Sequence, residues 1–82
     1  MEYGIKVKDK KGQEKVLVIG RPYEYRKGTP VFAVADDEDK SSSHLLTAAE
    51  IKHNWSAWAS DLFSGDERIT LKEAEKRGIE IL

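Results

Sequence analysis

The chain has 82 residues, no cysteine and a formal net charge of −1, so we expect one domain spanning residues 1–82 with a small core. The lack of cysteine excludes disulfides, thiolate zinc sites and thiol nucleophiles, and it is typical of a reducing compartment. No secretory segment follows Met1 and the longest apolar run, 16–19, is far shorter than the roughly 20 residues of a membrane span, so we expect a cytoplasmic protein.

The first two predicted elements form a hairpin. Apolar and polar residues alternate over residues 2–8, which predicts a strand with one dry and one wet, basic face. Turn formers follow at 9–12, where Gly12 can take the positive φ of a tight connection. Successive apolar residues at 16–19 then predict a strand that is covered on both faces and lies centrally in its sheet.

Two more strands are predicted before the middle of the chain. The segment 20–22 breaks the second strand, 23–25 alternates again, 27–30 is a second turn, and 31–35 is β-branched and apolar. These segments predict a three- or four-stranded antiparallel meander. The segment 36–43 has no periodicity and little apolar content, so we expect an exposed loop there.

The second half of the chain carries two helix starts. Thr47 and Glu50 form a capping box, and a helix over about residues 47–63 should follow, closed by Gly65. Its apolar stripe consists of Ile51, Trp55, Trp58 and Leu62. A second, shorter helix begins with the capping box Thr70–Glu73 and stops at Gly78, and residues 79–81 alternate as a strand at the sheet edge.

The predicted fold class is therefore α+β: a small antiparallel β-meander packed against one amphipathic helix, with a short second helix and a C-terminal edge strand. This arrangement loosely resembles SH3-like small barrels with an inserted helix, which implies a partly closed sheet. The compact, charged, cysteine-free chain is also similar to many small accessory proteins of bacteria and their phages. Neither resemblance implies a function.

Charge is distributed unevenly and suggests a docking surface. Residues 1–30 carry eight basic and four acidic side chains, whereas residues 31–82 carry six basic and eleven acidic ones. We therefore predict a non-enzymatic protein-recognition or inhibitor module whose acidic surface docks on a basic partner. The residues expected to form that surface are Asp36, Asp37, Glu38, Asp39, Asp61, Asp66 and Glu67.

An alternative function is binding of single-stranded nucleic acid. Stacking rings and phosphate-seeking cations surround the second predicted turn, at Arg21, Tyr23, Tyr25, Arg26 and Lys27. Lys6 and Lys8 could lie on an adjoining strand face. The sequence pI of about 6.1 is well below that of a dedicated nucleic-acid binder, so this hypothesis ranks second.

A further alternative is weak calcium binding by degenerate EF-hand-like loops, read from Asp39 to Glu50 and from Leu62 to Glu73. Each frame lacks the glycine of the sixth position, and hydrophobic staples on capping boxes explain the same residues more simply.

No cofactor or metal is predicted. Catalysis has little support, because His44 and His53 lie near no recognisable nucleophile motif. Trp55 and Trp58 fit core packing better than a binding surface, but both hypotheses stay open.

Overall fold

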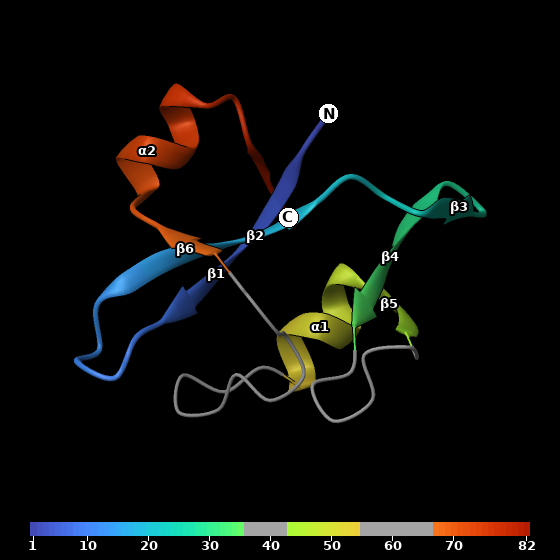
Figure 1. Cartoon of the computed structure of the whole chain (residues 1–82), viewed down its shortest axis with the longest axis horizontal. Coiled ribbons are helices and arrows are strands. Elements are labelled where there is room, and N and C mark those ends of the chain that lie inside the picture. Colours follow the sequence, from blue (N-terminus) through green and yellow to red (C-terminus); the bar gives the residue numbers. More distant parts are fainter. Residues whose placement is uncertain (36–42, 55–66) are drawn as a thin grey trace.

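The computed structural model describes residues 1–35, 43–54 and 67–82. Within these ranges it confirms a small α+β domain, built from two β-sheets and two short helices (Figure 1). In chain order the elements are β1 (Tyr3–Lys8), β2 (Glu14–Gly20), β3 (Glu24–Arg26), β4 (Thr29–Ala35), β5 (Ser43–Thr47), α1 (Ala48–Asn54), β6 (Glu67–Ile69), α2 (Leu71–Lys76) and β7 (Glu80–Ile81). Neither described helix is long and apolar enough to cross a membrane.

The strands are divided between two sheets, which corrects the expectation of one continuous meander. The first sheet has the order β6-β2-β1-β7, and the second has the order β3-β4-β5. The chain leaves the first sheet after β2, where Gly20 adopts a φ of 79° and Pro22 has no N–H for a ladder hydrogen bond. Because the chain turns away at this point, β3 begins a new sheet instead of extending the first.

The second strand is central, as predicted. β2 pairs with β1 on one side and with β6 on the other. Val16 and Leu17 are both fully buried, although their side chains point to opposite faces of the sheet. Both faces of the first sheet are therefore covered.

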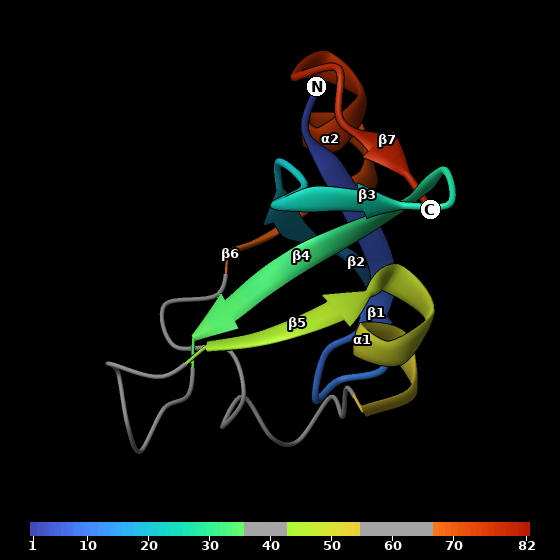
Figure 2. The same ribbon diagram turned by 90° about the vertical axis from the view of Figure 1, so that its right-hand side faces the viewer.

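The two covers of the first sheet differ. On one face Ile5, Val7 and Leu17 pack with Phe32 and Val34 of β4 and with Ile51 of α1, and Figure 2 shows the second sheet and α1 lying against β1. On the other face Val16 packs with Ala74 of α2 and with Ile79. The main core thus joins the two sheets, and α2 closes the opposite side.

Gly4 allows the chain around β7 to approach β1 closely. A Cβ atom at this position would lie 2.5 Å from Val16 Cγ1 and 3.1 Å from Ile79 Cγ2. β7 runs parallel to β1 at the edge of the sheet, and the Leu82 N–H donates to the Gly4 carbonyl at 2.9 Å. The predicted C-terminal edge strand is confirmed.

The β3–β4 connection is tighter than the sequence indicated. Arg26 pairs with Thr29, which leaves a two-residue turn with positive φ at Lys27 (51°) and Gly28 (82°). This is the geometry of a type I′ hairpin turn. Pro30 is tolerated in the middle strand of the sheet because β5 pairs with β4 only up to Val31, opposite Thr47, so Pro30 lies beyond the end of that ladder.

Both predicted helix starts are confirmed. The Glu50 N–H donates to Thr47 Oγ1, and the Glu50 carboxylate accepts from the Thr47 N–H. The Glu73 N–H likewise donates to Thr70 Oγ1. After Lys76, α2 is closed by a Schellman motif in which Gly78 has a φ of 71° and the longer bond runs from the Ile79 N–H to the Ala74 carbonyl.

Other predictions lie outside the described residues. They are the loop at 36–42 and the helix beyond residue 54, with Trp55, Trp58, Leu62 and Gly65. Ser43 was expected at the end of that loop but is the first residue of β5. The sequence patterns also do not predict a strand at Leu45 and Leu46, which lie in β5, or at the residues of β6.

Candidate functional site

Two exposed tyrosines lie at the β3–β4 hairpin. Tyr23 and Tyr25 retain 68% and 59% of their accessible surface. They are two residues apart, and the Tyr23 N–H donates to the Val31 carbonyl at 2.7 Å, which holds Tyr23 against β4 just before β3 begins. Tyr25 lies directly opposite Pro30, which places these two side chains on the same face.

Tyr25 is connected to the first sheet through Tyr3. The pKa of Tyr3 is raised from its ordinary value of 10.0, chiefly by a side-chain hydrogen bond with Tyr25 and then by partial desolvation. The Tyr3 ring also meets Phe32 edge-on, with ring centroids 5.9 Å apart. Because Phe32 belongs to the main core, this chain of contacts anchors the otherwise exposed Tyr25 ring.

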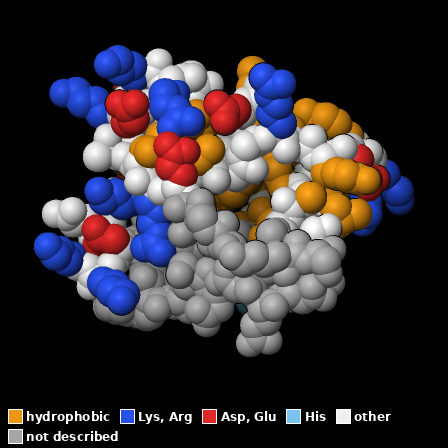
Figure 3. Space-filling view, viewed as in Figure 1, with side chains coloured by type: hydrophobic (Ala, Val, Ile, Leu, Met, Phe, Trp, Pro, Cys, Tyr) orange, Lys and Arg blue, Asp and Glu red, His pale blue; other side chains and the backbone are white. Residues whose placement is uncertain are grey.

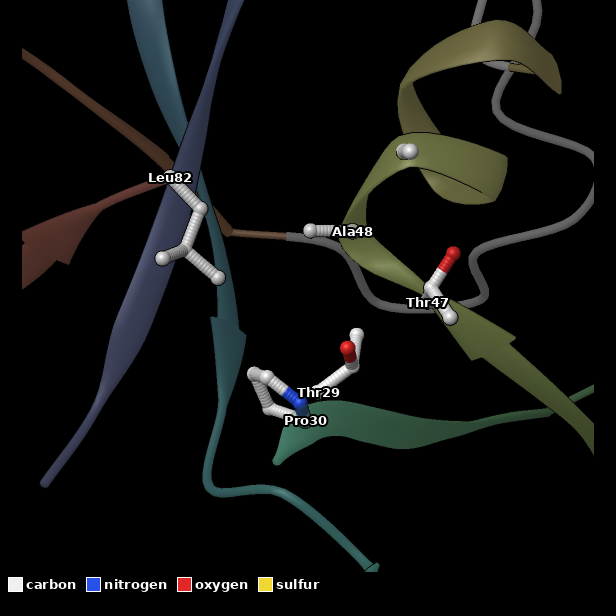
Figure 4. Close-up of a pocket in the computed structure, with 6 residues that line it drawn as sticks. Thr29, Pro30, Thr47, Ala48 and Leu82 are labelled. Carbon is white, nitrogen blue, oxygen red and sulfur yellow. The ribbon is translucent and has the colours of Figure 1, made fainter. Parts of the chain in front are cut away.

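A pocket of about 250 Å³ opens beside this hairpin. Its lining comes from three places: Thr29 and Pro30 at the start of β4, Thr47 to Ala49 where β5 passes into α1, and Leu82 after β7. Figure 4 shows these segments surrounding one space, with Leu82 facing the β4 and α1 residues. The lining side chains carry no charge, so the pocket is suited to an apolar side chain.

Tyr23, Tyr25 and the pocket residues together form what we call the tyrosine face. Figure 3 shows hydrophobic side chains gathered over this end of the molecule. Leu82 retains 39% of its surface there. On soluble proteins, contiguous exposed apolar area is a feature of interaction sites.

The predicted basic and aromatic residues are only partly brought together. Arg21 and Lys27 are exposed near the two tyrosines, but the Arg26 guanidinium is paired with Glu24 at 3.4 Å. Lys6 does not adjoin them. It pairs with Val16 and so lies on the α2 side of the first sheet, the face turned away from the second sheet.

The predicted acidic surface is largely untested by the described residues. Asp36 to Asp39, Asp61 and Asp66 lie outside them. Glu67 is described, and its carboxylate accepts from Arg77 at 2.6 Å. This pairing raises the pKa of Arg77 and leaves Glu67 partly neutralised toward a basic partner.

The calcium hypothesis gains no site in the described part of the chain. Glu50, the final position of one predicted loop, uses its carboxylate to bond the N–H and hydroxyl of Thr47. No group of three or more metal-ligating side chains occurs among residues 1–35, 43–54 and 67–82. His44 lies on β5 and His53 on α1.

Sequence reasoning found the tyrosines but missed the pocket. Its lining residues come from three segments up to about 50 positions apart, and Ala48, Ala49 and Leu82 carry no motif. The sequence offered one signal, namely a proline that follows a tight turn and must lie where the ladder needs no N–H from its strand.

Comparison with known proteins identifies no relative from which a function could be inferred. No family model matches the chain, and no curated protein or solved structure shows significant similarity to it.

Proposed function

We propose that this chain is a small, non-enzymatic protein-recognition module of the cytoplasm, and that the tyrosine face is its contact surface. The observation that carries the proposal is the uncharged pocket beside two exposed tyrosines. Tyrosine is enriched at protein interfaces because it contributes a large apolar ring, a hydroxyl and few rotatable bonds. The role is that of an accessory or inhibitor protein, as the composition suggests.

The volume of the pocket indicates the size of the side chain that it could hold. A cavity of about 150 Å³ engineered in another protein holds benzene, so about 250 Å³ holds one leucine, isoleucine or phenylalanine side chain. We propose that a partner segment inserts one such residue, while Tyr25 packs beside it.

Single-stranded nucleic acid is the second candidate, favoured by the exposure of both tyrosine rings. Two features argue against it. The pocket lining has no charge with which to meet a phosphate, and Arg26 is already paired with Glu24. An acidic docking surface at Asp36 to Asp39 is a separate proposal for the same class of function. It predicts that binding is lost when these acidic residues are replaced, and not when Leu82 is replaced.

The test is a pull-down from bacterial lysate, with and without nuclease, followed by measurement of the affinity of the retained protein for point variants. Leu82→Ala and Leu71→Ala are a matched pair, because the two leucines are 39% and 37% exposed and only Leu82 lines the pocket. We expect Leu82→Ala and Tyr25→Ala to weaken binding about tenfold, equivalent to about 1.4 kcal/mol. Leu71→Ala should leave it unchanged.

Three results would contradict this assignment. Retention that disappears with nuclease would point to nucleic acid. Equal losses for the two leucine variants would remove the pocket from the interface. Loss of binding in Asp37→Lys/Asp39→Lys, with Leu82→Ala unaffected, would transfer the contact to the acidic surface. Circular dichroism of each variant separates loss of binding from loss of fold.

A further inference from the structure

The β1–β2 hairpin concentrates basic side chains away from the tyrosine face. Residues 6–15, which we call the lysine hairpin, contain five lysines and two acidic residues. Of the lysines, four are exposed and Lys15 is half-buried. Figure 3 shows Lys and Arg side chains gathered toward the hairpin end of the molecule, and Figure 1 places this end opposite β3 along the longest axis.

The outer part of this hairpin is a ribbon of only two strands. β7 pairs with β1 only at Tyr3 and Gly4, and β6 pairs with β2 only at Val16 to Val18. Within the described residues, no third strand therefore flanks residues 7–15. Such a ribbon is narrow enough to enter a groove that a wider sheet could not enter.

The turn at the end of the ribbon is held firmly by its own hydrogen bonds. The Asp9 carboxylate accepts from the N–H groups of Lys11 and Gln13 at 2.9 and 2.8 Å. The Asp9 N–H and carbonyl bond to Gln13 and Gly12 in turn. Asp9 thus acts as a turn residue, and the side chains of Lys10 and Lys11 are left at the tip.

Positive charge lies on both faces of the ribbon, although Val7 on one of them packs into the main core. Lys6 and Lys8 project from one face, since they alternate with the buried Val7, and Lys15 lies opposite Val7 on the other face. Of the two acidic side chains of the hairpin, Asp9 is held in the turn and Glu14 lies opposite Lys8. There is no aromatic residue between positions 4 and 22, so the ribbon has nothing on which to stack a base.

We propose that the lysine hairpin binds double-stranded DNA through its phosphate backbone, without sequence specificity, with the ribbon lying in the major groove. The major groove of B-form DNA is about 12 Å wide and admits a two-stranded β-ribbon, whereas the major groove of duplex RNA is too narrow for such entry. Cations at the tip and on both faces of the ribbon match the phosphates on both walls of the groove. This goes beyond protein recognition, because a partner held at the tyrosine face would be carried to DNA at the other end.

The experiment measures fluorescence anisotropy of the full chain with a labelled duplex DNA, over a series of salt concentrations. Non-specific binding of this kind has a dissociation constant of about 10⁻⁴ to 10⁻⁶ M. For about three phosphate contacts, the slope of log affinity against log salt concentration is about −2.7. The affinity should therefore fall about 40-fold between about 50 and about 200 mM salt.

Two charge-matched variants locate the contact. Lys10→Gln/Lys11→Gln should bring the slope to about −0.9, because each lost phosphate contact removes about one unit. Lys27→Gln/Lys52→Gln removes the same charge from exposed positions outside the hairpin and should leave the slope near −2.7. The Lys11 N–H, a backbone group, donates to the Asp9 carboxylate in the turn, and the substitutions leave this bond in place, so the first variant should fold normally.

The proposal is overturned if Lys10→Gln/Lys11→Gln binds duplex DNA as the parent chain does. It is also overturned if Lys27→Gln/Lys52→Gln alone loses binding, which would place the contact at the β3–β4 turn or at α1. It is also overturned if single-stranded DNA, duplex RNA or polyglutamate binds more tightly than duplex DNA at the same salt. Those results would indicate stacking, a different groove or an acidic protein partner, respectively.

Discussion

Replacing Gly4 by alanine should destabilise the fold through one crowded contact. The new Cβ atom would lie 2.5 Å from Val16 Cγ1 and 3.2 Å from the Leu17 carbonyl oxygen. Gly4 does not belong to the glycines with positive φ, so its backbone conformation suits alanine and the cost is steric. β2 lies in the centre of the sheet and Ile79 packs from the other side, which leaves the three segments little room to separate.

The magnitude follows from two opposing effects. Overpacking a filled core costs about 1–3 kcal/mol, and alanine regains about 0.5–1 kcal/mol that glycine costs in a strand interior. We therefore expect a net loss of about 1–2 kcal/mol in the free energy of unfolding. For a domain of this size, that lowers the melting temperature by about 5–15 °C.

The assay is urea denaturation of Gly4→Ala, Val16→Ala and the double variant. Because the closest atom belongs to Val16, its truncation should relieve the crowding, and the double variant should be more stable than the sum of the single effects by about 0.5 kcal/mol or more. Gly12→Ala is the control, since no atom lies within 4 Å of its Cβ position and its cost comes from a φ of 79°. A neutral Gly4→Ala, or strictly additive effects with Val16→Ala, would refute the reasoning.

Two further predictions concern the helix starts and the alkaline limit of stability. Thr47→Ala and Thr70→Ala should each cost about 1 kcal/mol in chemical denaturation, whereas serine at either position should retain most of the capping; equal losses for serine and alanine would count against it. The raised pKa of Tyr3 means that its protonated form stabilises the folded state, an effect fully present below pH 10 and lost as the pH rises through the folded-state pKa. Tyr3→Phe should therefore show a shallower decline in denaturation midpoint above about pH 10, and an unchanged decline would show that the Tyr3 hydroxyl does not contribute.

Local patterns in the sequence predicted the elements whose causes are local. The capping boxes at Thr47 and Thr70 need only residues three positions apart, and the Schellman motif at Gly78 needs only a residue that tolerates positive φ. The hairpin of β1 and β2 follows from alternation and from the Gly12 turn. Such elements are readable because each is stabilised by its own neighbours in the chain.

The same distinction between local and long-range causes applies to the two candidate sites. The lysine hairpin could be located from sequence, because its residues are contiguous. Its narrowness could not, since that depends on where β6 and β7 stop pairing. The tyrosine face was seen in part from Tyr23 and Tyr25, but its pocket requires Leu82 to meet Pro30 and Ala48, and only long-range packing brings these together.

What the sequence by itself determined is the α+β class, the central position of β2, both helix starts and the edge strand at residues 79–81. Each rests on a local pattern, namely alternation along a strand, a short run of apolar residues, or a helix cap. What only the tertiary structure decided is the division of the strands into two sheets, the addition of β5 and β6, and the pocket. Short strands such as β6, with three residues, are stabilised mainly by the strand they pair with, so their own residues hold too little information to reveal them.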